Sequence, residues 1–162
     1  MPASTYAELY QFEDVLLPQY SAVLTAAGVT NHYTRATGNL ATPRVRLELK
    51  MLGTTDHTAV VYGGATMFDV WRFTLTATVI TGRNQNNSTH QTYLGKVRYL
   101  LLAPSTSSTI NTALPYHSVC KSLAAEEPSS TDTVQEEDQD VTVLQFGGLV
   151  QIDASAWPNS AP

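Results

Sequence analysis

The clearest pattern lies in the middle of the chain, where apolar and polar positions alternate. From Arg44 to Met51 every second residue is apolar and the residues between are charged. A period of two puts apolar side chains on one face of a β-strand and charged ones on the other. Residues Phe68 to Thr81 alternate similarly, with threonines opposite large apolar residues. We expect an antiparallel pair of strands with a long connection over Gly53–Thr66 and an apolar face that packs on a helix.

The N-terminal segment has apolar residues at intervals of three and four, the period of an amphipathic helix. This pattern runs over Ser4–Gly28, and Gly28 is a natural helix stop. Pro18 interrupts the pattern and predicts a kink or two helical pieces. The following segment, Thr30–Pro43, has little periodicity and predicts a loop.

A second helix is predicted after the long alternating segments. Ser88 or Thr89 can cap it, its apolar face lies within Tyr93–Leu101, and it should end before Pro104. Gly95 costs such a helix about 1 kcal/mol relative to alanine. We expect a close backbone contact there, such as one with the sheet, to offset that cost.

The last third of the chain is more mixed. Ser105–Asn111 predicts a polar connector, and Tyr116–Ala125 is ambiguous between helix and strand, with strand favoured. The acidic run Glu126–Asp140 predicts a hairpin tip or a loop that becomes ordered on contact. Val141–Asp153 predicts a final strand, with a bulge or bend at the Gly147-Gly148 pair.

These elements predict an α+β fold. We expect a mixed or antiparallel sheet of about four strands covered by two helices, in the order α-β-β-α-β-β. A chain of 162 residues is the size of one ordinary domain. We assign residues 1–157 to a single α+β domain and residues 158–162 to a flexible C-terminal tail.

Charge narrows the possible partners. The chain has 9 basic and 14 acidic residues and a net charge of -5. Affinity for nucleic-acid backbones rests on clustered lysine and arginine, so this balance argues against a broad DNA-binding surface.

The N-terminus is acidic where a secretory signal needs a basic start, and apolar runs stay well below ~18 residues. We expect synthesis in a cytoplasm and no membrane segment.

The residue types that carry catalysis or bind metals are scattered. Cys120 is the only cysteine, which excludes an internal disulfide and a multi-thiolate metal site. His117 would lie on the opposite face of a strand from Cys120, which favours a partly buried, inert thiol. The chain has no Gly-x-Ser-x-Gly elbow, phosphate-binding glycine loop or His-Glu-x-x-His helix. We expect no enzyme activity, no cofactor and no metal. The four histidines fall in predicted loops and at element ends: His32, His57, His90 and His117.

The layout of the chain resembles the tail-terminator (tail-completion) proteins of long-tailed bacteriophages. The resemblance spans nearly the whole chain and rests on the order of the elements and the residue types within them. The segments that carry it are the N-terminal helix ending near Gly28, the strand entry Ala41–Val45, the strand start Phe68–Arg72 running to Arg83, the helix His90–Arg98 and the closing segment Ile152–Trp157.

The resemblance implies a structural subunit of the virion that does no bond chemistry. Such a protein forms a hexameric ring at the head-proximal end of the tail tube, ends tube polymerisation and docks the head-tail connector or stopper protein. DNA would only pass through the lumen of the ring. The localisation implied is the head-tail junction of the virion, after synthesis in the host cytoplasm.

A ring needs two different patches on each subunit that meet head-to-tail. The acidic run could meet basic residues of a neighbouring subunit, such as those on the first strand, or of the tube, with rim charges setting register more than affinity. The residues of this predicted interface are Arg44, Arg46, Lys50, Glu136, Glu137, Asp138 and Asp140.

Two alternatives remain open at this stage. The first is another head-tail joining, neck or tail-tube protein, although tube subunits are chiefly β and this chain predicts two helices. The second is a small-molecule-binding α+β domain with a pocket between the sheet and the second helix. Its candidate residues are His90, Tyr93 and Arg98.

Overall fold

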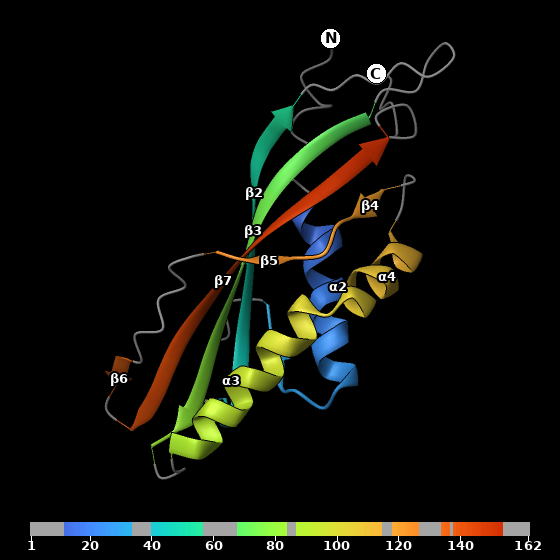
Figure 1. Cartoon of the computed structure of the whole chain (residues 1–162). Coiled ribbons are helices and arrows are strands. Elements are labelled where there is room, and N and C mark those ends of the chain that lie inside the picture. Colours follow the sequence, from blue (N-terminus) through green and yellow to red (C-terminus); the bar gives the residue numbers. More distant parts are fainter. Residues whose placement is uncertain are drawn as a thin grey trace, which may run out of the picture.

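The computed structural model describes residues 12–33, 40–56, 68–83, 87–114, 118–126, 134–136 and 138–153 (Figure 1). The helices in these ranges are α2 (Glu13–Ala26), α3 (Asn87–Leu102) and α4 (Pro104–Ala113). The strands are β1 (Asn31–His32), β2 (Arg44–Asp56), β3 (Phe68–Gly82), β4 (Val119–Cys120), β5 (Ala124–Ala125), β6 (Val134–Glu136) and β7 (Gln139–Asp153).

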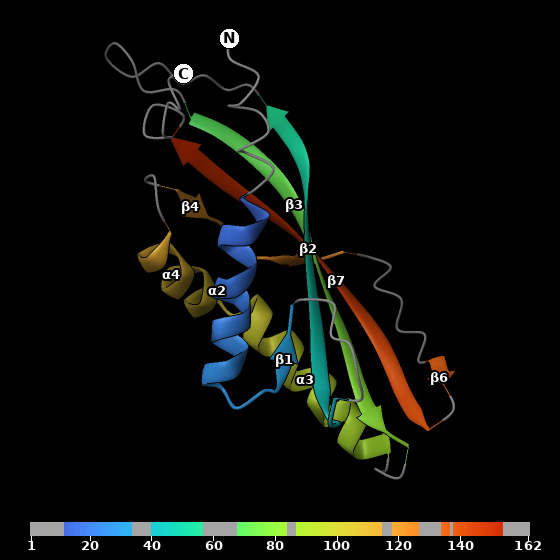
Figure 2. The same ribbon diagram turned by 180° about the vertical axis from the view of Figure 1, so that it is seen from behind.

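Three long antiparallel strands, β2, β3 and β7, form the body of the sheet. The order is β1-β2-β3-β7-β4, and β5 and β6 also pair with β7. β3 pairs with β7 without interruption from Phe68↔Asp153 to Gly82↔Gln139. β1 joins the outer edge of β2 in parallel. Figures 1 and 2 show α2, α3 and α4 on the same side of the long strands, with β6 on the opposite side.

The core lies between the helices and the inner face of the sheet. On β3 the inner face is the apolar row predicted from the alternation, from Trp71 to Val79. From α2, Tyr20 packs its ring 6.3 Å from that of Phe73, centroid to centroid. The backbone N–H of Met51 donates a hydrogen bond to Glu13 Oε1 at 2.8 Å, which ties the first turn of α2 to the edge of β2.

The structure confirms the α+β class, the antiparallel pairing of the two alternating segments and the helical cover on their apolar face. The expected count of about four strands and two helices is wrong, because the described residues form seven strands and three helices. The expected α-β-β-α-β-β order therefore also fails. The extra strands are two or three residues long, and elements this short leave no period in a sequence.

The Ser105–Asn111 segment, predicted as a connector, lies within helix α4. Serine and threonine compete for backbone hydrogen bonds and usually favour turns, which explains the error. In α4 these hydroxyls bond back to the preceding turn instead, as Thr109 Oγ1 does to the Ser105 carbonyl at 2.9 Å. Pro104 occupies the first turn, and Thr106 and Ile110 are buried, so packing of one face holds the helix.

Helix α2 runs continuously through Pro18 rather than breaking into two pieces. Its buried residues, Leu16, Tyr20 and Leu24, lie on one face, and their packing offsets the backbone hydrogen bond that proline cannot donate. Gly28 ends the helical segment as predicted, with a φ of 73° that L-residues rarely adopt. The part of the predicted helix before Phe12 lies outside the described residues.

The structure shows neither a close contact of Gly95 with the sheet nor a bulge at Gly147-Gly148. Gly95 is exposed, and a Cβ built on it would have nothing within 4 Å, so it makes no close contact with the sheet. The Gly147-Gly148 pair forms no bulge, because pairing with β3 continues through both residues. Gly148 instead faces the core, where a Cβ would lie 2.1 Å from Cζ of Phe73. The register shifts occur elsewhere, between β2 and β3 after Met51.

The predicted long connection is shorter than expected, since β2 continues to Asp56 and only residues 57–67 separate it from β3; these lie outside the description. In Tyr116–Ala125, the described part includes strands β4 and β5, which confirms the favoured interpretation. The acidic run closes as a hairpin in which β6 pairs with β7, from Val134↔Val141 to Glu136↔Gln139. The C-terminal tail lies outside the described residues.

Candidate interaction surfaces

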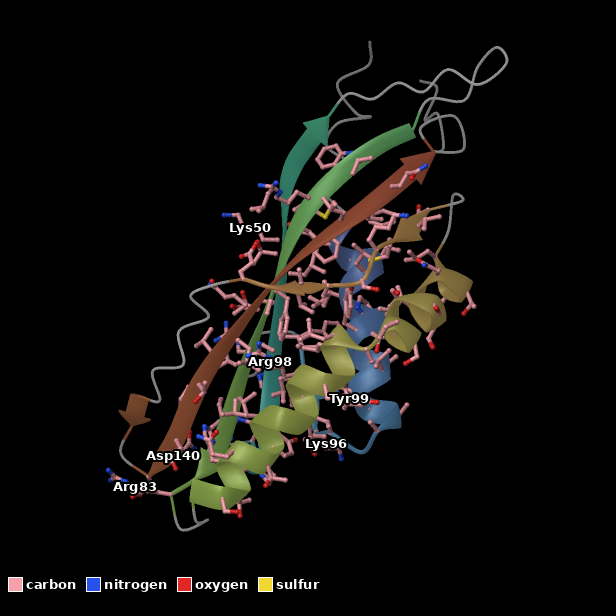
Figure 3. All side chains as sticks on the ribbon, in the orientation of Figure 1. Lys50, Arg83, Lys96, Arg98, Tyr99 and Asp140 are labelled. Carbon is pink, nitrogen blue, oxygen red and sulfur yellow. The ribbon has the colours of Figure 1, made fainter. Side chains whose placement is uncertain are left out.

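The three predicted basic residues lie on the face of β2 that points away from the helices, where they alternate with the buried row. Arg44 donates to the backbone carbonyl of Leu40. Arg46 forms an ion pair with Glu48, and both side chains are well exposed, so the pair adds at most about 1 kcal/mol to stability. Lys50 is exposed (Figure 3). Two of the three cations are therefore satisfied within their own chain.

The predicted acidic residues lie around the β6–β7 hairpin, at the end of the sheet where β2 begins with Arg44. Glu136 belongs to β6, Asp138 lies in the turn and Asp140 in β7, while Glu137 falls outside the described residues. Asp138 is exposed, and its carbonyl accepts a hydrogen bond from the backbone N–H of Arg83 at 2.7 Å.

Asp140 lies on the opposite face of the sheet from Arg44, Arg46 and Lys50. Asp140 is directly opposite Thr81, whose side chain is buried on the helix side. Residues opposite one another in an antiparallel pair share a face, so Asp140 also points to the helix side. Arg46 to Lys50 point to the other side. Asp140 therefore does not face these three cations, and Arg46 forms its ion pair with Glu48.

The face of the sheet opposite the helices is charged on β2 and hydroxylic on the central strand β3. Thr74, Thr76 and Thr78 on β3 are half-buried and lie opposite the apolar row, as the alternation predicts. On β7 the same face carries Leu149, which is 38% exposed. An antiparallel sheet commonly leaves one face to solvent, so this surface needs no partner to be stable.

Sequence reasoning missed the outer face of α3. Tyr99 is 73% exposed there, the highest value among the large hydrophobic residues of the described chain. Lys96 and Arg98 are also exposed. In Figure 3, Lys96 and Tyr99 lie on the side of α3 away from Asp140, and Arg98 lies nearer the long strands. The sequence signal was the helical period itself, because Tyr99 falls opposite the buried Val97 and Leu101, with Lys96 and Arg98 to either side of it.

His90 is a buried structural residue and does not lie in a loop or at a solvent-exposed element end. Its Nδ1 lies 2.7 Å from Thr81 Oγ1 and its Nε2 lies 2.8 Å from Thr142 Oγ1, so it bridges β3 and β7 from the first turn of α3. Burial lowers the pKa of His90 below its usual value, while the Asp140 charge opposes that shift. The neutral imidazole therefore predominates at pH 7.

The residues of the alternative small-molecule pocket do not converge. His90 points into the sheet and is fully hydrogen-bonded. Tyr93 is half-buried and bonds to the backbone of Thr30, and burial raises the pKa of its hydroxyl. Arg98 is exposed. A binding site needs polar groups aimed at one volume, and these three point in different directions.

Cys120 is buried, and its sulfur lies 3.2 Å from the hydroxyl of Tyr20. Burial raises the pKa of the thiol, so the reactive thiolate is disfavoured. His117 falls outside the described residues.

Within the part of the chain that the structure describes, no three His, Cys, Asp or Glu side chains gather as a metal site. No described helix has the length and apolar character needed to cross a bilayer.

Comparison with known proteins gives a likeness of fold. No protein-family model matches the chain, and no curated protein does. A solved structure described as "Virion of native gene transfer agent (GTA) particle" contains a similar chain. The two superpose with a TM-score of 0.53 at 17% identity, over 86% of this chain and 93% of that chain. The likeness extends over nearly the whole of both chains, and it concerns the fold.

Proposed function

We propose that this protein is a structural subunit of a phage-like virion, and specifically a tail terminator. In this role it assembles as a ring, with six subunits implied by the family resemblance, at the head-proximal end of the tail tube. There it ends tube polymerisation and provides the docking surface for the head-tail connector or stopper protein. The ring is made from subunits synthesised in the host cytoplasm, and DNA passes through its lumen.

The observation that carries the proposal is the fold likeness to a chain of a virion particle over 86% of this chain. A shared fold alone does not fix function. The likeness gains weight because it agrees with the layout of the sequence, which resembles tail-terminator proteins from the N-terminal helix to the closing strand.

The chemistry of the chain supports a role in assembly. The histidine that came closest to a site is hydrogen-bonded on both ring nitrogens, and the lone thiol is buried against a tyrosine. A nucleophile or general base must reach its substrate, and neither group does in this arrangement.

The surfaces support a head-to-tail ring. A ring requires two different patches on each subunit. The acidic β6–β7 hairpin and the basic residues on β2 provide two such patches, and among the described side chains no ion pair joins them. In the proposed ring, Glu136, Glu137, Asp138 and Asp140 meet basic residues of a neighbouring subunit or of the tail tube, with Arg44, Arg46 and Lys50 as one candidate surface.

The test is negative-stain electron microscopy of the purified protein, alone and mixed with tail tubes of its own particle. A terminator forms a closed ring, caps one end of each tube and stops tubes from lengthening when free tube subunits are added. Decoration along the whole tube would indicate a tube protein, and binding only to heads would indicate a neck protein. Either result would contradict the terminator role.

A further inference from the structure

Charge is unevenly distributed along the sequence. The stretch Val70–Lys121 contains basic residues and no acidic one, and the stretch Ser122–Pro162 contains acidic residues and no basic one. The first set is Arg72, Arg83, Lys96, Arg98 and Lys121. The second set is Glu126, Glu127, Asp132, Glu136, Glu137, Asp138, Asp140 and Asp153. The two sets attract between molecules, because opposite charges steer association and fix its register.

Helix α3 displays part of the basic set in a form suited to an interface. Tyr99 and Gly95 are four residues apart and lie on one face of the helix. Lys96 and Arg98 flank that face on either side (Figure 3). An exposed aromatic residue with cations around it has the composition of a protein-binding surface, where tyrosine and arginine are enriched.

The α3 cations differ from Arg44 and Arg46 of β2 in being unengaged, a property they share with Lys50. Arg44 and Arg46 are held by a backbone carbonyl and by Glu48 of their own chain. For Lys96 and Arg98, no hydrogen bond or ion pair is formed within the described residues. A neighbour that binds α3 therefore loses no internal ion pair.

Gly95 gives a second, independent observation. Glycine in the middle of a helix is unfavourable by about 1 kcal/mol relative to alanine. No neighbour within the described chain requires it, since a Cβ there would have open space for 4 Å. A helix face without a Cβ at its centre lets another backbone approach closely. The sheet of the same subunit does not make that approach, so the space is open to a neighbour.

We propose that the outer face of α3, made of Gly95, Lys96, Arg98 and Tyr99, is the docking surface for the acidic β6–β7 hairpin of a second copy of this chain. The inference rests on the proposed ring and specifies its subunit contact. Asp138 in the hairpin turn and Asp140 in β7 supply the opposing carboxylates. The contact joins two different patches, so it propagates head-to-tail, and it makes a ring when the rotation between successive subunits closes.

A second copy fits this surface better than DNA does. Binding to a phosphate backbone grows with the number of cations that face it, and here two cations flank an uncharged centre. The protein as a whole carries a charge of -5, which repels polyanions at long range. The acidic hairpin of a neighbour offers a small number of carboxylates, which matches the small number of cations.

The test uses charge reversal with rescue on the full-length chain, followed by sedimentation velocity and electron microscopy with and without tail tubes. K96E/R98E and D138K/D140K should each weaken self-association at least about tenfold at low salt, because like charges then face each other across the contact. The single variant D138K changes only the exposed turn and should weaken it in the same direction. The quadruple variant K96E/R98E/D138K/D140K should associate again, since both signs are exchanged. Thermal melting checks that each variant is folded.

Two matched controls locate the effect. Lys121→Glu reverses an exposed cation of the same basic stretch outside α3 and should leave association unchanged. Lys50→Glu reverses the exposed cation of β2; a loss equal to that of K96E/R98E would move the contact to the open sheet face and overturn the α3 assignment. Cross-linking adds geometry, because Cys120 is buried: a mixture of Tyr99→Cys and Asp138→Cys chains should cross-link to each other. Cross-linking of Tyr99→Cys chains alone would place α3 against α3 and contradict the proposal.

The outcomes separate this inference from the proposed function. Normal rings from K96E/R98E would overturn the α3 contact and leave the ring intact. A wild-type chain that stays monomeric both in concentrated solution and with tail tubes would contradict the ring, and with it the proposed terminator. If K96E/R98E associates normally but no longer binds DNA, the face is assigned to nucleic acid.

Discussion

Gly148 provides a strong quantitative test of the fold. Replacing it with alanine adds a Cβ 2.1 Å from Cζ of Phe73 and within 2.6 Å of both Cε atoms. Carbon atoms normally approach no closer than about 3.5 Å, so the clash is at least about 1.4 Å deep. Phe73 cannot move away freely, because it is fully buried and packs against Tyr20. Forcing a methyl group into a packed core costs about 1–3 kcal/mol. We expect Gly148→Ala to reach the upper part of that range.

The assay is chemical and thermal denaturation of purified variants. In a protein of this size, 2–3 kcal/mol corresponds to a fall in Tm of about 4–12 °C. Gly147→Ala is the matched control: its Cβ would meet the flexible Glu126 carboxylate on the other face, so we expect a change below about 0.5 kcal/mol. Phe73→Leu removes the clashing ring atoms and should make Gly148→Ala less costly by at least about 1 kcal/mol in a double-mutant cycle. Equal destabilisation by the two alanine variants, or a cycle without coupling, would refute this packing.

Three further predictions concern single residues. His90→Gln should destabilise the protein by about 1–3 kcal/mol, because at least one buried threonine hydroxyl loses its partner. Since burial lowers the pKa of His90 below its usual 6.5, the unfolded state binds more protons as pH falls past that value, so wild-type stability should drop from pH 7 to pH 5. In urea titrations, the stability of His90→Gln should fall less than that of the wild type between pH 7 and pH 5. An equal fall in both proteins would contradict the role given to His90. Cys120 should resist alkylation by iodoacetamide in the native state and react on unfolding, as mass spectrometry can measure; rapid native labelling would show an accessible thiol. Gly95→Ala should raise the free energy of unfolding by about 0.5–1 kcal/mol while weakening self-association; a stabilised chain that associates normally would remove the role given to this glycine.

The parts of the fold that could be predicted from the sequence are those with a long period. The alternation from Arg44 and from Phe68 identified β2 and β3, their pairing and their buried faces. Helix α3 also followed from its apolar spacing. Helix α4 was missed because its serines and threonines satisfy helical carbonyls, a choice that depends on the packing of Ile110 and not on local preference.

The sites were harder to predict, because they depend on which face a residue occupies. Sequence reasoning grouped Arg44, Arg46 and Lys50 correctly on one strand face but could not show that Glu48 engages Arg46. It placed His90 at an element end, which agrees with its position in the first turn of α3, but could not show that the ring is buried between Thr81 and Thr142. Gly148 was interpreted as a bulge because a glycine pair gives the same signal whether it bends a strand or admits a ring from the neighbouring strand.

The central claim is that this chain works as a ring at the end of a virion tail. The most direct measurement is cryo-electron microscopy of intact particles that carry a tagged copy of the chain. We expect tag density in one closed ring at the head-proximal end of the tail tube. Particles that lack the protein, or tag density repeated along the tube, would contradict it.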